Sequence, residues 1–80
     1  MPYVDKETRT RLQTEAPRTS GELNYIITKA CLAFLPASPK YDDYNRVVGV
    51  LESAKLEFNR RAVAPYENQK AFDNGDVYDV

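Results

Sequence analysis

The chain has 80 residues, of which 42% are hydrophobic and 29% charged, and its net charge is −1. A chain this short forms one domain at most with a thin core, because small domains bury only about 60% of the surface that their unfolded chains expose. The composition excludes an intrinsically disordered chain, and the near-neutral charge excludes a global field that would hold DNA or RNA. We therefore expect a folded domain that gains stability from self-association.

The sequence indicates a cytoplasmic protein. Its single cysteine, Cys31, excludes an intrachain disulfide framework and fits a reducing compartment. The first residues lack the apolar region of a signal peptide, and no apolar stretch is long enough to cross a bilayer. We expect no membrane association.

Charged residues dominate positions 1–18, and Leu12 is the only large apolar side chain between Asp5 and Glu15. One leucine provides little to anchor a helix to a core. We expect one to three exposed helical turns here, ended by Pro17, because the residue before a proline is disfavoured in helical conformation.

A helix is predicted over residues 20–35. Thr19 and Glu22 have the spacing of a capping box, in which each side chain accepts a hydrogen bond from a backbone amide of the first turn, and Pro36 ends the segment. Its apolar residues recur with helical spacing and form one stripe. They are Leu23, Ile26, Ile27, Ala30, Cys31 and Phe34.

A longer amphipathic helix is predicted over residues 43–64, with an aspartate of the Tyr41-Asp42-Asp43 run capping its first amides. The stripe that defines it comprises Tyr44, Val47, Val48, Leu51, Ala54, Lys55, Phe58 and Ala62. Pro65 then leaves two alternatives open, a kink in this helix or a separate extension over residues 66–73.

The predicted fold is all-α. It is a small helical hairpin or three-helix domain with a core over residues 19–75 and one long amphipathic helix, assembled into an oligomer. Asn74-Gly75 has the composition of a helix stop, and residues 76–80 form a tail that is extended or disordered.

No catalytic constellation is present. The chain lacks histidine, which removes the commonest general base and metal ligand and the Ser/His and Cys/His nucleophile pairs. Cys31 lies on an apolar stripe, where cysteine behaves as a small hydrophobic side chain. Glu57 has the spacing of ordinary helical ion pairs to Arg60 and Arg61. We predict a protein that is not an enzyme and has no metal and no cofactor.

Gly49 is the glycine that calls for an explanation, because a glycine inside a helix costs about 1 kcal/mol relative to alanine. With Ser53 it forms a small-residue face that favours close helix–helix contact, including contact across a two-fold axis. The alternative is a glycine tolerated inside the chain's own core.

The segment between Tyr44 and Tyr66 carries four basic and two acidic residues. Arginine forks beside a tyrosine ring suit a ligand that combines phosphates with a nucleobase, although a solvated basic helix end explains the same residues. The candidate ligand-binding residues are Asn24, Tyr25, Asn45, Arg46, Lys55, Arg60, Arg61 and Tyr66. The arginines and Lys55 would contact phosphates, a tyrosine would stack on a base, and an asparagine would read base or ribose edges.

Several motifs together resemble a family of short proteins from phages and prophage-rich bacterial genomes, whose name implies no function. They are GELNY at 21–25, GVLE at 49–52, KLEF at 55–58, Arg60-Arg61, PYE at 65–67 and NGDVY at 74–78. A looser likeness is to the helical hairpin of phage sponge proteins that sequester cyclic-nucleotide signals. It implies oligomers that bind ligands between subunits and rests on Asn45-Arg46, Gly49, Phe58, Arg60-Arg61 and Pro65.

The leading hypothesis is a phage-encoded sponge that binds a small cyclic nucleotide immune signal without cleaving it and counters the host's anti-phage defence. The alternative is a helical protein–protein interaction module that acts as an inhibitor or adaptor of a host or phage protein. A third hypothesis is a small hydrolase that uses carboxylates and a metal.

Overall fold

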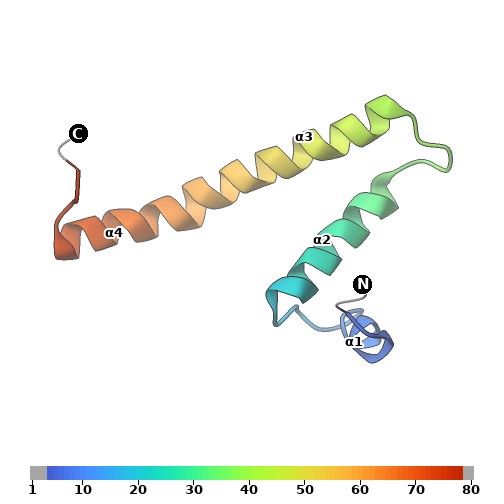
Figure 1. The fold of residues 1–80 in the computed structure, drawn as a ribbon, viewed down its shortest axis with the longest axis horizontal. Coiled ribbons are helices and arrows are strands. Elements are labelled where there is room, and N and C mark those ends of the chain that lie inside the picture. Colours follow the sequence, from blue (N-terminus) through green and yellow to red (C-terminus); the bar gives the residue numbers. More distant parts are fainter. Residues whose placement is uncertain (1–3, 79–80) are drawn as a thin grey trace. The chain divides into compact units, whose positions relative to one another are not determined.

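The computed structural model describes residues 4–78 and confirms an all-α fold, with no strand among these residues (Figure 1). The elements are α1 (Lys6–Arg11), α2 (Ser20–Phe34), α3 (Tyr41–Phe58), the π-helical turn η1 (Asn59–Val63) and α4 (Ala64–Asn74). The last three follow one another without a break and form a long helix of 34 residues. Contacts divide the chain into two units, Met1–Asp43 and Tyr44–Val80, which we describe separately.

In the first unit, α1 is a short helix that Asp5 caps by accepting a hydrogen bond from the Thr8 amide at 2.8 Å. Leu12, which directly follows α1, is only 7% exposed, and Val4 is 5% exposed. We expected Leu12 to lie on an exposed helix, and that prediction was wrong. Val4 lies just before α1 and Leu12 just after it. Each end of the helix therefore has one buried apolar side chain, whereas the prediction relied on Leu12 alone.

A carboxylate connects α1 to the start of α2. As predicted, Thr19 accepts a hydrogen bond from the Glu22 amide at 3.1 Å. The reciprocal bond differs from a capping box, because Glu22 Oε1 accepts from the amide of Arg18 at 3.0 Å, one residue earlier than expected. The same oxygen accepts from the Arg11 guanidinium. Glu22 therefore joins α1, the connecting loop and α2 at one point.

The predicted stripe of α2 is only partly covered. Ile26 and Cys31 are half-buried, whereas Leu23, Ile27 and Phe34 are 49%, 41% and 63% exposed. The helix ends as predicted, because Leu35 before Pro36 adopts an extended conformation.

The long helix starts at Tyr41, two residues before the predicted start. Asp43 Oδ2 accepts a hydrogen bond from the Lys40 amide at 2.9 Å, and the Asp43 amide donates to the Lys40 carbonyl at 3.0 Å. This closes the first turn at Lys40. At the far end, Gly75 has φ +83°, a left-handed value that glycine adopts without strain, and its amide caps the Ala71 carbonyl. The helix stop at Asn74-Gly75 is confirmed.

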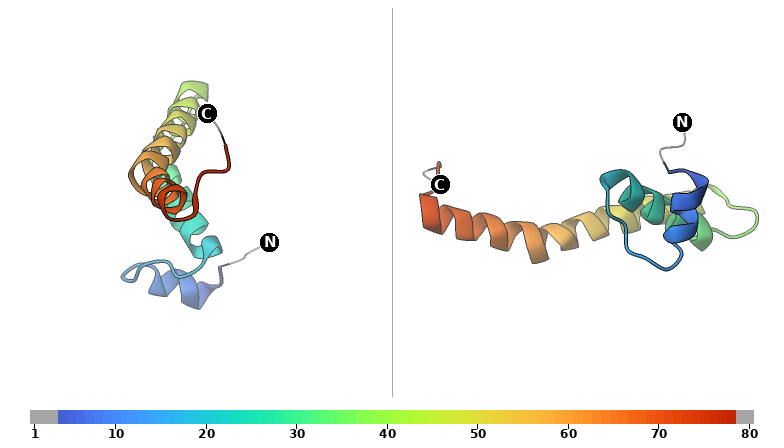
Figure 2. Two further views of the ribbon diagram at one scale, coloured as in Figure 1. Left: turned by 90° about the vertical axis from the view of Figure 1, so that its left-hand side faces the viewer. Right: turned by 90° about the horizontal axis from the view of Figure 1, so that it is seen from below.

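Of the two alternatives for Pro65, the separate extension was wrong, because the helix continues through the proline without a break. A proline in a helix lacks an amide donor, and its ring clashes with the carbonyl four residues earlier, here that of Arg61. The chain inserts one wider turn instead, in which the Ala64 amide donates to the Asn59 carbonyl five residues back. The helix passes through the proline on this π-turn. The ribbon is unbroken along the long helix in both further views (Figure 2).

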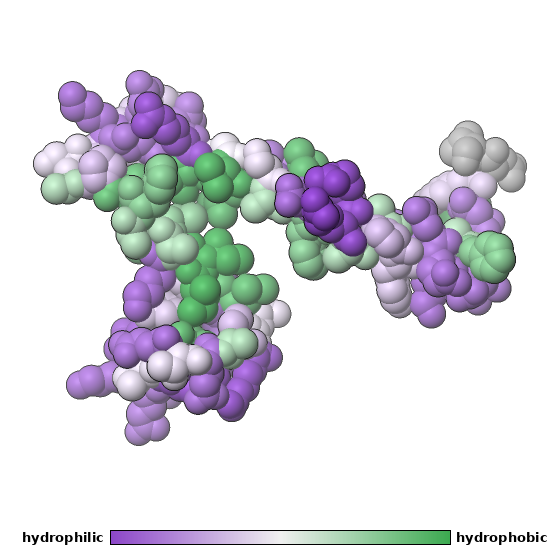
Figure 3. Space-filling view, turned by 180° about the vertical axis from the view of Figure 1, so that it is seen from behind, coloured by the Kyte–Doolittle hydropathy of each residue, from purple (hydrophilic) through white to green (hydrophobic). Residues whose placement is uncertain are grey.

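The second unit contains no buried side chain among its described residues, 44–78. Val47, Val63, Ala64 and Ala71 are half-buried, and every other residue of the segment is exposed. Hydrophobic groups therefore lie at the surface between the charged groups of the long helix (Figure 3).

Replacing Pro65 with alanine should convert the π-turn to α-helix, because alanine restores the amide donor and removes the ring. We expect the free energy of unfolding of the long helix to rise by about 1–3 kcal/mol, up to the cost of a proline in a helix interior. Thermal unfolding followed by circular dichroism measures this change. Pro39→Ala, outside the helix, is the matched control, and a loss of helicity in Pro65→Ala would contradict the explanation.

The Glu22 contact should make the first unit sensitive to acid. The amide of Arg18, followed by the Arg11 guanidinium, lowers the pKa of Glu22 below its ordinary value of 4.5. A lowered pKa in the folded state adds stability above pH 4.5, which is lost as the pH falls through the folded-state pKa. NMR shifts of Leu12 should therefore change as the pH falls below 4.5. Glu22→Gln should remove this step and Glu7→Gln should retain it, whereas an unchanged step in Glu22→Gln would refute the role of this carboxylate.

Candidate functional site

The predicted ligand residues of the second unit lie at two separate places on the long helix. Asn45 and Arg46 occupy the first turns of α3, whereas Arg60 and Arg61 lie in η1. Asn45 and Arg60 are 15 positions apart, as are Arg46 and Arg61, which is about 22 Å along the axis. One chain therefore cannot bring all of these side chains to one small ligand, and a site that uses both pairs needs a second chain.

The basic turn of η1 is organised by one carboxylate. Glu57 lies 3.6 Å from the guanidinium of Arg60 and 3.6 Å from that of Arg61, which confirms the predicted ion pairs. The side chains of both arginines remain 66% and 70% exposed, so water screens these pairs and they contribute little stability. Their main consequence is positional, because Glu57 holds two guanidinium groups together on one turn.

The aliphatic stem of Lys55 was predicted to lie along the edge of the apolar stripe, with its ammonium group free to contact phosphates. The ammonium group lies 3.3 Å from Glu52, and the side chain is 71% exposed. The two partners are three residues apart on the surface of α3, the ordinary spacing of a helical ion pair.

Both candidate tyrosines lie against a lysine of the following turn. The Lys29 ammonium is 5.8 Å from the centroid of the Tyr25 ring, and the Lys70 ammonium is 5.6 Å from that of Tyr66. These are cation–π distances. Neither lysine was predicted as part of a site, although the Tyr-x-x-x-Lys spacing that creates the contacts is visible in the sequence.

Asn24 also has a partner on its own helix, because its Oδ1 accepts a hydrogen bond from the Thr28 hydroxyl at 3.2 Å. Asn24 and Tyr25 thus form one small polar group on α2 with the residues one turn further along.

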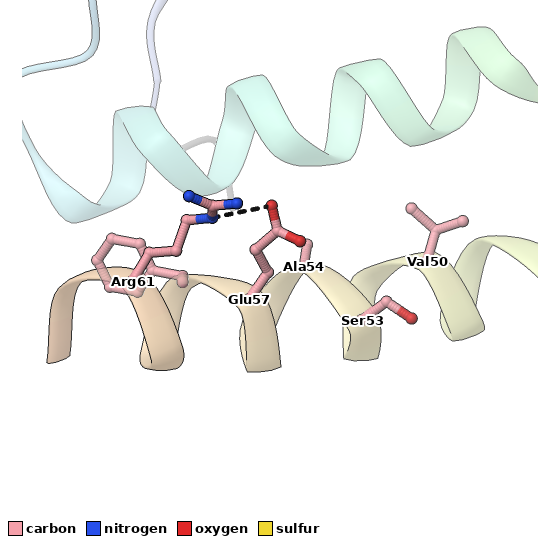
Figure 4. A pocket seen from close by; sticks show the side chains of 6 residues that line it. Val50, Ser53, Ala54, Glu57 and Arg61 are labelled. Carbon is pink, nitrogen blue, oxygen red and sulfur yellow. Dashed lines mark ion pairs between the residues drawn. The ribbon is translucent and has the colours of Figure 1, made fainter. Parts of the chain in front are cut away.

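A shallow hollow runs along α3 and η1 beside the basic turn (Figure 4). Its lining residues are Val50, Ser53, Ala54, Glu57, Phe58 and Arg61. The Arg61 and Glu57 side chains lie against each other along it, and Val50, Ala54 and Phe58 supply apolar walls. The hollow therefore combines apolar surface with one arginine, a mixture that suits contact with another protein.

Gly49 and Ser53, the predicted oligomer contact, lie on the side of α3 away from Leu51, and Ser53 also lines one edge of the hollow. Each is two residues from Leu51 and therefore about 200° around the helix from it. A Cβ placed on Gly49 would meet no atom within 4 Å, so Gly49 is not accommodated inside the chain's own core. The space beside Gly49 is open to a second helix.

Three further observations on the described residues concern metal-ligand clusters, membrane-spanning helices and the single cysteine. Among residues 4–78, no cluster of three or more His, Cys, Asp and Glu side chains could hold a metal ion. No helix in the same range has the length and hydropathy to cross a membrane. Cys31 is half-buried on α2.

Residues 1–77 match the family described as Domain of unknown function (DUF6899). The chain belongs to this family. The match covers all the motifs on which the sequence resemblance rested except the last residue of the 74–78 motif, and its description assigns no activity. Neither a curated protein nor a solved structure matches the chain.

Proposed function

We propose that this chain is a non-enzymatic binding module whose working surface is α3, and that another protein chain covers that surface. The observation that carries the proposal is the absence of any buried side chain among the described residues 44–78. Helices in proteins obtain most of their stability from packing an apolar face, not from propensity. A long helix with an apolar face and no covering layer in its own unit requires a partner.

The apolar face of α3 is defined by six residues with helical spacing, Tyr44, Val47, Val48, Leu51, Ala54 and Phe58. Several are large and exposed: Tyr44 is 51% exposed, Val48 61% and Phe58 66%. Leu51, in the middle of the face, is 40% exposed. Aromatic and aliphatic side chains at the centre, with charged residues around them, are the usual composition of a protein interface.

A matched pair of substitutions tests this proposal. Leu51→Asp places a charge in the middle of the apolar face, whereas Leu56→Asp places the same charge about 140° around the same helix. Sedimentation velocity and affinity capture should show that the wild type and Leu56→Asp associate with a protein chain, either a second copy or another protein. Leu51→Asp should reduce the association at least tenfold, about 1.4 kcal/mol or more. A wild-type chain that binds no protein at any concentration would contradict the proposal.

A second candidate function is sequestration of a small cyclic nucleotide by a phage-encoded sponge. The observation that favours it is the basic turn, where two exposed guanidinium groups on η1 are followed by the Tyr66–Lys70 pair of α4. Guanidinium forks bind phosphates in bidentate fashion, and an exposed aromatic ring can stack on a base. The resemblance to phage proteins supports the proposed origin and the role against host defence.

Calorimetric titration with cyclic di- and trinucleotides and cyclic ADP-ribose isomers tests the second function. A sponge should bind one of these ligands and release it intact on heating. Arg60→Gln with Arg61→Gln should abolish binding, whereas Glu57→Gln should strengthen it, because it removes the carboxylate that competes for the guanidinium groups. Arg9→Gln on α1 is the control. Absence of binding across the panel refutes sequestration of these ligands, and recovery of a converted ligand would indicate an enzyme.

A further inference from the structure

We propose that the α3 apolar face is covered by the same face of a second copy, which runs antiparallel to the first around a two-fold axis at Leu51. This inference rests on the proposed function, since it names the partner of the same surface. Three properties of α3 support it: the spacing of its apolar residues, the charges at its two ends and the position of the hollow.

The spacing of the apolar face is symmetric about Leu51. Its members lie three, four and seven residues before and after that position, with Lys55 completing the pattern on the second side. An antiparallel copy centred on Leu51 therefore places Tyr44 opposite Phe58 of the partner subunit and, because residues on the same flank of the face meet, Val47 beside the partner's Ala54. Aromatic side chains meet each other, and a larger aliphatic residue meets a smaller one. Val48, on the other flank, meets the partner's Lys55, whose aliphatic stem can cover it while the ammonium stays in water.

The charges at the two ends of α3 distinguish the antiparallel from the parallel arrangement. Asp42 and Asp43 lie in the first turn of α3, and Arg60 and Arg61 follow its last residue. Asp43 and Arg61 are 18 residues apart, which corresponds to five turns of α-helix, so they lie close to the same flank of the face but about 27 Å apart along the axis. They cannot meet within one chain.

The antiparallel copy brings these opposite charges together. The partner's Asp43 then lies opposite residue 59, within about 3 Å along the axis of Arg61. A dimer has two such pairs of Arg61 with the partner's Asp43, one at each end of the interface. A parallel copy would place acidic ends together and basic ends together, and such like-charge contacts select against that arrangement.

The hollow lies on the flank of α3 that carries Arg61. The antiparallel arrangement places part of the second copy against it. The hollow extends from Val50 to Arg61, and residues 43–47 of the second copy reach the same level of the helix. The partner's Val47 faces the apolar wall near Ala54 and Phe58, while Glu57 holds the Arg61 guanidinium 3.6 Å away on the side where the partner's Asp43 arrives.

Disulfide trapping tests orientation and register together. In a Cys31→Ser background, Tyr44→Cys and Phe58→Cys are prepared as separate chains and oxidised alone and as a mixture. We expect the mixture to form a covalent dimer, since facing positions come within the Cα separation of roughly 4.4–6.8 Å that a disulfide requires. Neither chain should cross-link alone. Leu56→Cys, about 140° from the centre of the face, is the matched control and should remain monomeric. Cross-linking of each chain alone would show a parallel pair and overturn the inference.

Charge reversal provides a second, independent readout. Arg61→Asp should weaken dimerisation measured by sedimentation equilibrium by about three- to tenfold, the range for partly exposed ion pairs. Adding Asp43→Arg to the same chain should restore the affinity, because the two charges are exchanged across the antiparallel interface. Absence of restoration, with helicity retained, would contradict the pairing of these ends.

Failure of this inference is distinguishable from failure of the proposed function. A chain that stays monomeric up to millimolar concentration, but binds another protein through Leu51, overturns self-pairing and leaves the binding module intact. A chain that stays monomeric and binds no protein overturns both.

Discussion

The apolar face of α3 imposes the main physical constraint on this protein. The free energy of burying an aliphatic or aromatic side chain is about 1.5–3 kcal/mol, and it is gained only when another surface excludes water from that side chain. No side chain of the described residues 44–78 is buried. The ion pairs along this helix are exposed and cannot substitute for a packed face. The long helix is thus an element whose stability and role depend on what covers it.

The π-turn near Pro65 is the second important feature of the long helix. It keeps 34 residues in one continuous helix while accommodating a residue that usually breaks helices. The wider turn contains Arg60 and Arg61, so the same local distortion carries two adjacent arginines. π-turns inside α-helices occur frequently at functional sites. The basic turn is therefore the natural place for a charged partner or ligand to meet the helix.

Local sequence signals predicted the helices well, because capping and proline effects act within a few residues. Thr19 and Pro36 bracket α2, and Gly75 ends the long helix, as their chemistry requires. The burial of Leu12 could not be predicted in this way, since it depends on contacts that join α1 to residues outside it.

The π-turn and the Glu22 contact were missed for related reasons. Pro65 allows several backbone responses, and sequence alone does not rank them. Glu22 has two nearby donors besides the capping amide, and only the path of the loop after α1 decides that Arg18 and Arg11 are the ones it uses. In the candidate site, the Glu57 ion pairs followed from their spacing in the sequence. The separation of Asn45 and Arg46 from the basic turn follows from the unbroken continuation of the helix.

Hydrogen exchange along α3 at low and high protein concentration tests most directly whether a protein surface covers the apolar face. If another copy or another protein covers it, the amides of residues 44–58 should become more slowly exchanging when the chain is concentrated or its partner is added, while those of α1 change little. Equal and slow exchange of these amides at all concentrations, with no partner present, would show that the helix is stable alone and would contradict the central claim.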